Sequence, residues 1–196
     1  LALNILAATL ATIRYRSAGC FDRSLFLPLV VGSIPASFVG GLLTLPGAVY
    51  KPLLAVLLLL AAVRLAWPRQ KPDGTHRRMP TWAGVLCGAA IGFLSGLTGV
   101  GGGIYLTPLL LFAGWAETKT AAGVSAAFIL VNSIAGLTGR LIAEPSLPSQ
   151  LPQWAGAVIV GSFIGATLGS RVFGPSIFRY LLSLVLVVAA LKLLAG

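Results

Sequence analysis

Apolar residues gather into long segments along this chain, and short polar or basic stretches separate them. A helix that crosses the hydrocarbon core of a bilayer needs about 20 apolar residues, and most of these segments approach that length. The pattern predicts an all-α, polytopic transmembrane helical bundle. Its membrane segments are expected at residues 1–13 (the end of a span), 25–44, 52–67, 81–114, 118–141, 153–172 and 177–195.

The segment at residues 81–114 does not fit a single crossing. As one helix it would be about 51 Å long, against ~30 Å of hydrocarbon, yet it is too short for two full crossings. It contains the run Gly-Leu-Thr-Gly-Val-Gly-Gly-Gly at residues 96–103, and glycine is a weak helix former. The run predicts a glycine-broken helix with a longer and a shorter arm. Either the helix spans the membrane discontinuously, or a half-helix re-enters after a complete span.

A glycine break at membrane depth is typical of a transport site. Exposed backbone N–H and C=O groups survive in hydrocarbon only inside protein or against a water-filled cavity, and transporters place substrates at such breaks. Backbone amides and the positive end of the following half-helix would attract an anion. The substrate-binding residues expected from this run are Gly99, Gly101, Gly102 and Gly103.

An internal repeat relates the two ends of the chain. Val-Gly-Ser at residues 31–33 recurs at 160–162, and both copies continue with small residues at every fourth position, a pattern that lets membrane helices approach closely. The repeat predicts residues 1–67 as the remainder of a first membrane repeat, 68–80 as a cytoplasmic linker and 81–196 as a second repeat. It also predicts that about 48 residues with a first glycine break precede residue 1.

Polar residues on the spans are expected to complete the site. Ser125 and Asn132 lie seven residues apart, so they share a helix face. Asn4 follows the same repeat as Asn132, at an offset of 128 residues, and should supply a second amide. Packing between helices is the alternative role for such residues, and it is the one expected for Ser133.

The charged residues lie mainly near the ends of the predicted spans. The chain has 14 Lys+Arg against 4 Asp+Glu, although 57% of its residues are apolar and mean hydropathy is +0.96. Because the basic residues lie between apolar segments, they indicate positive-inside topology and contact with membrane lipid; nucleic acid, which needs clustered exposed charge, is excluded as a partner. Residues 14–24 and 68–80 should both be cytoplasmic. By a margin of one charge, the two repeats should be inverted relative to each other.

The sequence does not match the common motifs of enzymes. The glycine run has Ile104 where a dinucleotide fingerprint needs its third glycine, and no Gly-Lys-Ser/Thr follows it. His76, the one histidine, falls in the polar linker, and Glu117 and Glu144 flank spans without forming a ligand cluster. Neither catalysis nor a metal or other cofactor is therefore expected.

The glycine run also carries a family resemblance. Gly-Val-Gly-Gly-Gly-Ile-Tyr-Leu-Thr-Pro at residues 99–108 resembles the Gly-x-Gly-Gly-Gly…Pro signature of the TauE/SafE sulfite exporter family. The stretch at 120–133, which ends in Asn-Ser, is similar to that family's next helix, with Val124 where many members carry Thr. The resemblance implies export of small sulfur-containing anions, such as sulfite or organosulfonates, across a prokaryotic inner membrane.

Several alternatives stay open at this point. Lys119, Arg140 and Arg171 lie near the ends of spans, where contact with lipid phosphate is the simpler role and attraction of an anion at a gate is the other. An uncoupled anion channel or a membrane scaffold would use similar sequence features. A homo-oligomer is compatible with the small-residue faces.

Overall fold

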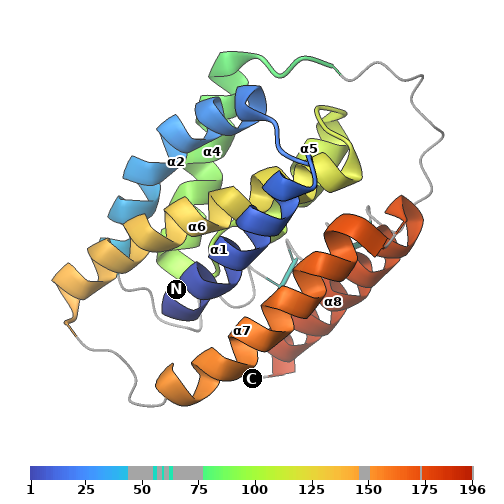
Figure 1. Ribbon diagram of the computed structural model, residues 1–196. Helices are drawn as coiled ribbons and strands as arrows, with labels where there is room; N and C mark the ends of the chain where they lie inside the picture. The colour runs from blue at the N-terminus through green and yellow to red at the C-terminus, as the bar shows by residue number, and fades with distance from the viewer. Residues whose placement is uncertain are drawn as a thin grey trace.

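The structure is a computed structural model that describes residues 1–43, 55–56, 59, 62–63, 77–145, 151–172 and 174–195. Within these ranges all regular structure is helical, in seven α-helices and one π-helical turn (Figure 1). The elements are α1 (Ala2–Ser17), α2 (Arg23–Leu42), α4 (Thr81–Thr98), α5 (Gly103–Ala113), α6 (Thr118–Ala143), α7 (Leu151–Thr167), η1 (Leu168–Val172) and α8 (Pro175–Ala195).

The expected membrane setting is confirmed in its coarse form. Four of the described stretches are long and apolar enough to cross a bilayer: α2, α4, α6, and α7 together with η1. The span expected at residues 52–67 and most of the linker expected at 68–80 lie outside the described residues. The basic stretch expected at residues 14–24 is partly helical, because α1 continues to Ser17 and α2 already begins at Arg23.

Glycines bring α2 and α4 into backbone contact. A Cβ at Gly88 of α4 would collide with the carbonyl of Leu29 on α2, and one at Gly96 would collide with the carbonyl of Ser37. From the α2 side, a Cβ at Gly32 would collide with the carbonyl of Val85. Such close approach is how small residues hold helices together without a hydrophobic driving force. Gly88 and Gly96 therefore serve helix packing in α4.

The segment at residues 81–114 forms a span followed by a returning half-helix. α4 ends at Thr98, four residues intervene, and α5 begins at Gly103. The end of α5 comes back to the start of α4, since the backbone N–H of Arg77 donates to the carbonyl of Gly114 over 3.1 Å. Of the two arrangements that the sequence left open, the described residues show this one.

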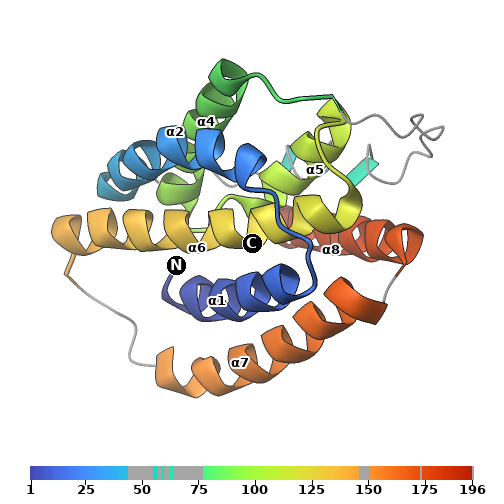
Figure 2. The same ribbon diagram turned by 45° about the horizontal axis from the view of Figure 1, so that its top comes forward.

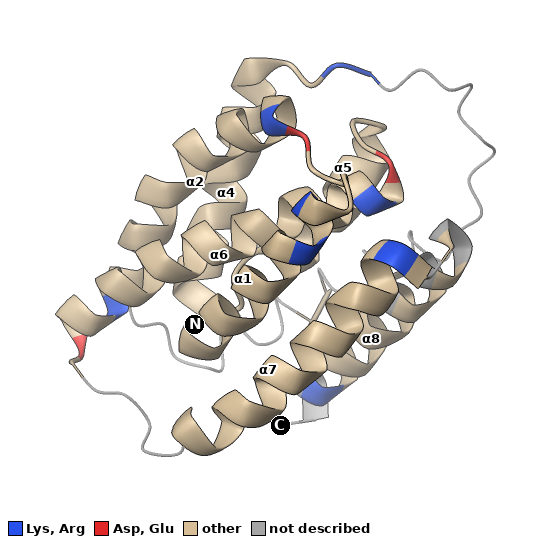
Figure 3. Ribbon diagram, viewed as in Figure 1, with Lys and Arg blue, Asp and Glu red and all other residues tan. Residues whose placement is uncertain are grey.

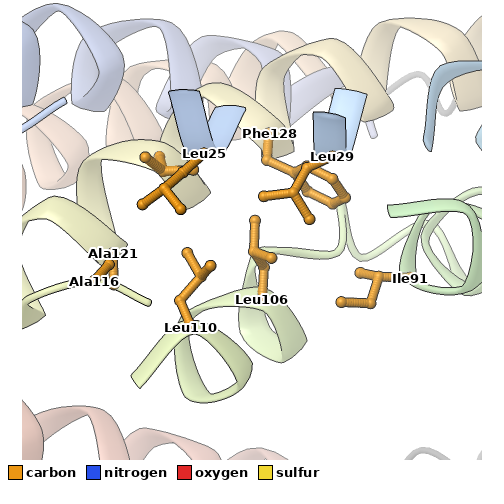
Figure 4. Packing of buried hydrophobic residues seen from close by; sticks show 9 residues of the cluster. Leu25, Leu29, Ile91, Leu106, Leu110, Ala116, Ala121 and Phe128 are labelled. Carbon is orange, nitrogen blue, oxygen red and sulfur yellow. The ribbon is translucent and has the colours of Figure 1, made fainter. Parts of the chain in front are cut away.

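A buried apolar cluster fixes the returning half-helix in place (Figure 4). Leu106 and Leu110 of α5 are fully buried, and so is Phe128 of α6. Side chains buried in this way make many van der Waals contacts, which hold helices together in lipid, so the cluster holds α5 firmly against its neighbours. It draws residues from α2, α4, α5, the α5–α6 connection and α6, namely Leu25, Leu29, Ile91, Leu106, Leu110, Ala116, Ala121, Val124 and Phe128.

α1 runs antiparallel to α6. Near the start of α1, the amide of Asn4 and the Ser133 hydroxyl of α6 both lie beside Gly101. Beyond the other end of α1, the carbonyl of Cys20 lies against Gly123, in the second turn of α6. Helix α1 therefore lies along α6, with α7 on its other side (Figure 2).

Basic residues gather at one end of the helices (Figure 3). The end of α1, the start of α2, the residues before α4, the start of α6 and the turn η1 all carry them there. The opposite end carries the exposed ion pair Arg140–Glu144 and, on α8, Lys192. The basic residues of the first end are Arg14, Arg16, Arg23, Arg77, Arg78, Lys119 and Arg171.

Candidate substrate-binding site

The connection between α4 and α5 is built from glycines with left-handed backbone angles. Gly99, Gly101 and Gly102 have φ of 74°, 84° and 77°, a region that residues with a Cβ rarely adopt. Gly99 ends α4 as its cap, and the carbonyl of Gly102 accepts the N–H groups of Tyr105 and Leu106 to start α5. The sequence needs glycine here for the turn itself, before any question of binding.

Gly101 faces two polar side chains from two other helices. From the position that its Cβ would occupy, the Oγ of Ser133 lies 3.1 Å away and the Nδ2 of Asn4 lies 3.2 Å away. Asn4 also donates to the carbonyl of Gly99 over 3.3 Å. The loop, α1 and α6 thus meet at Gly101. Because Ile129 and Ser133 lie near the middle of α6, the meeting point is deep along that helix.

Two buried polar atoms at this level of α6 have no hydrogen-bond partner among the residues that the structure describes. They are the Oγ of Ser133 and the Oδ1 of Asn132, and both residues are fully buried. Buried polar atoms in proteins are nearly always satisfied, by protein, by water or by a ligand. The Ser133 hydroxyl is the one placed beside the glycine loop.

Asn132 itself is turned into its own helix. Its Nδ2 donates to the carbonyl of Phe128 over 2.8 Å, and its backbone carbonyl accepts the Ser37 hydroxyl over 2.9 Å. The structure therefore brings Asn4 to the loop, whereas the side-chain amide of Asn132 is engaged within α6. Ser133, which the sequence assigned to packing, is the α6 residue that brings a polar side-chain atom beside Gly101. Its position next to Asn132 was the only signal for it.

Ser125 lies on the α5 side of the loop. Its hydroxyl accepts a hydrogen bond of 2.8 Å from Thr107, and both side chains are buried. The same residue's carbonyl lies 3.3 Å from where a Cβ of Gly103 would be. Ser125 thus joins the first turns of α5 to α6, close to the loop.

The remaining glycines of the loop have different surroundings. A Cβ at Gly102 would meet Phe128, Ile91 and the Cβ of Ser95 at 3.0–3.1 Å, so this position is closely packed and largely apolar. A Cβ at Gly99 would have only a side-chain carbon of Leu1 within 4 Å, at 3.8 Å. Of the four glycines, Gly101 is the one whose three nearest atoms around that position include polar side-chain atoms.

The basic residues proposed for a gate do not converge on the loop. Lys119 lies in the first turn of α6 and Arg140 in its last, where it pairs with Glu144 over 2.7 Å. Arg171 is exposed in η1 (Figure 3). The sequence gave no indication of this π-helical turn.

Comparison with known proteins connects this geometry to a family. Residues 1–193 match the family model of the sulfite exporter TauE/SafE. The chain belongs to the TauE/SafE family. A relative from Sinorhizobium fredii, named probable membrane transporter protein y4hK, is 36% identical over 99% of this chain and 80% of its own length. Probable membrane transporter protein MJ0441 from Methanocaldococcus jannaschii is 30% identical over 83% of this chain and 64% of its own. No solved structure matches.

Membership in TauE/SafE settles the class of the protein. It is a multi-pass membrane protein of a transporter family and not an enzyme. This confirms the family expected from the glycine signature. A transporter family also implies a small substrate, which makes the polar atoms around Gly101 the natural place to look for its binding site.

Proposed function

We propose that this TauE/SafE protein exports small sulfur-containing anions, such as sulfite or organosulfonates, and binds them at the glycine loop of residues 99–103. The observation that carries the binding site is the fully buried Ser133 hydroxyl, which lacks a partner and lies beside Gly101 opposite the amide of Asn4. The substrate class is taken from the family, and a prokaryotic inner membrane is its expected location.

The chemistry of the loop suits an oxyanion. The first N–H groups of a helix have no partner within the helix, and the first turn of α5 directs its positive end toward the loop. Asn4 and Ser133 add side-chain donors from two directions. Glycine at position 101 leaves room for an oxygen atom to approach the backbone.

We also propose that residues 1–67 and 81–196 form two inverted halves joined by a cytoplasmic linker at 68–80. The antiparallel course of α1 and α6 supports this arrangement, because Asn4 and Asn132 occupy matching positions in the repeat. Lys119 and Arg171 then lie at the cytoplasmic surface, where they contact lipid phosphate.

A flux measurement in proteoliposomes tests the function and the site together. The protein should mediate saturable flux of labelled sulfite or of a sulfonate. Ser133→Ala should raise the half-saturating concentration by about ten- to a hundredfold, because a hydrogen bond to a charged partner is worth ~1.5–3 kcal/mol. Thr138→Ala is the matched control on α6, since its exposed hydroxyl only donates to the carbonyl of Ile134.

Each part of the proposal can fail separately. Flux that rises linearly with substrate concentration would indicate a channel instead of a carrier. Saturable flux that Ser133→Ala leaves unchanged would move the site away from Gly101. The absence of any flux of these anions would remove the substrate class.

A further inference from the structure

The side-chain donors around Gly101 are neutral. The amide of Asn4 and the hydroxyl of Ser133 are the polar side-chain atoms nearest to the Cβ position of this glycine, and the methyl carbon of Ile129 is the third near neighbour. The positive contribution comes from the start of α5, where a helix dipole amounts to about half a unit charge. The site thus offers hydrogen bonds and a partial charge.

The charged side chains of the elements around the loop lie near the ends of the helices. On α1 they are Arg14 and Arg16, ten or more residues beyond Asn4. On α6 they are Lys119 and Arg140, the second of which is paired with Glu144. On α4 the titratable side chain is Cys87 and on α5 it is Tyr105; neither carries charge in its protonated form.

We propose that the loop at residues 99–103 selects singly charged sulfur oxyanions: bisulfite and sulfonates rather than the sulfite or sulfate dianions. This inference rests on the proposed function. Desolvation cost rises with the square of the charge, so a dianion pays about four times as much as a monoanion of the same size. Its attraction to the half charge of α5 only doubles. With neutral donors at the site, the monoanion is favoured.

If the site selects by charge, binding depends on pH through the protonation of the substrate and not through that of the protein. Bisulfite loses its remaining proton near neutral pH, whereas a sulfonate such as methanesulfonate keeps one negative charge throughout this range. Asn4 and Ser133, the polar residues beside Gly101, do not titrate in this pH range. Sulfite should therefore bind less well as pH rises, and a sulfonate should bind equally well.

Competition at several pH values tests this inference. Saturable uptake of labelled methanesulfonate into proteoliposomes is measured between about pH 6 and about pH 8, with unlabelled sulfite, methanesulfonate or sulfate as competitor. The inhibition constant of total sulfite should rise by roughly five- to tenfold across this whole pH range, because the fraction present as bisulfite falls by that factor as the pH passes its pKa. That of methanesulfonate should stay constant, and sulfate should compete at least tenfold less well. Labelled sulfonate as the readout avoids the leak of sulfur dioxide through lipid.

The outcomes separate this inference from the function on which it rests. An inhibition constant of sulfite that is flat or falls with rising pH overturns the charge selection while leaving transport intact, as does sulfate that competes as well as methanesulfonate. Saturable sulfite uptake without methanesulfonate uptake also overturns the charge selection, whereas lack of saturable uptake of both anions overturns the proposed function instead. Asn4→Lys, which adds a cation beside Gly101, should improve sulfate competition relative to methanesulfonate, with Asn4→Gln as the neutral control. Should Asn4→Lys fail to fold, the pH profile of the unaltered protein still decides.

Discussion

At the scale of single residues, two glycines with the same backbone conformation differ in what surrounds them. Gly101 and Gly114 both have positive φ, at 84° and 67°. A Cβ at Gly101 would lie between the Ser133 hydroxyl and the Asn4 amide, while a Cβ at Gly114 would have nothing within 4 Å. A substitution at Gly114 introduces only the strain of a left-handed residue, whereas one at Gly101 also fills space at the candidate site.

Comparing Gly101→Ala with Gly114→Ala therefore tests the site directly. Both substitutions should cost about 1–3 kcal/mol of strain, and Gly101→Ala should lower the protein level in the membrane further, because its methyl group also meets the Cγ2 of Ile129 at 2.8 Å. Gly101→Ala should in addition abolish saturable anion flux, because its methyl group occupies the place of the substrate oxygen. Flux normalised to membrane protein is the measurement. Equal normalised flux in the two variants would show that the space beside Gly101 is not used.

At the residue scale, the sequence predicted a break in the helix at the glycine run, and α4 ends there before α5 begins; substrate binding by these glycines stays a prediction. Positive φ at positions 99, 101 and 102 favours glycine, whereas the glycine run in the sequence indicated only that the helix breaks here. Which side chain of α6 faces the loop depends on the rotation of that helix about its axis. One residue corresponds to about 100° of rotation. The sequence could not fix this angle: the Asn132 amide, expected to face the site, donates within α6, and the Ser133 hydroxyl lies beside Gly101. Substrate binding at either residue stays a prediction.

At the scale of helices, matching glycines in the two repeats have different neighbours. On α2, a Cβ at Gly32 would collide with the backbone of α4. On α7, Gly161 matches Gly32 in the repeat but has nothing within 4 Å of its Cβ position, and it is exposed. The direction of α5 could not be predicted either. The length of residues 81–114 excluded one straight helix, and the hydrogen bond between Arg77 and Gly114 shows that α5 returns toward the start of α4.

Substituting alanine at Gly32 and at Gly161 should show which of the two matching glycines is needed for close helix packing. Gly32→Ala should strongly lower the amount of folded protein in the membrane, because the added methyl group meets the backbone of Val85. Overpacking of this kind costs ~1–3 kcal/mol or more. Gly161→Ala should leave the level unchanged or raise it, since alanine is the better helix former. Detergent-solubilised protein that elutes as a single species is the measurement; equal losses in both variants would contradict the packing described for α2 and α4.

At the scale of the whole molecule, the charges orient the bundle in the membrane. Basic residues such as Arg16, Arg23 and Arg78 share one end, and the positive-inside rule places that end in the cytoplasm. The chain begins at the opposite end, and α8 finishes there too (Figure 1). The sequence favoured the inverted arrangement by a margin of only one charge, because it could not tell how often residues 81–114 cross. The returning course of α5 supports the proposed arrangement.

Cysteine labelling in intact cells tests this orientation. In a background with Cys20 and Cys87 replaced by serine, a membrane-impermeant maleimide should react with Glu144→Cys and Lys192→Cys, and should reach Ser17→Cys only after the membrane is permeabilised. Ser17 and Glu144 are exposed at opposite ends of the bundle. Reaction at Ser17→Cys alone would reverse the bundle in the membrane. Reaction at Glu144→Cys but not at Lys192→Cys would place the C-terminal end of α8 in the cytoplasm; the two halves would then be parallel, and the proposed inverted arrangement would be wrong.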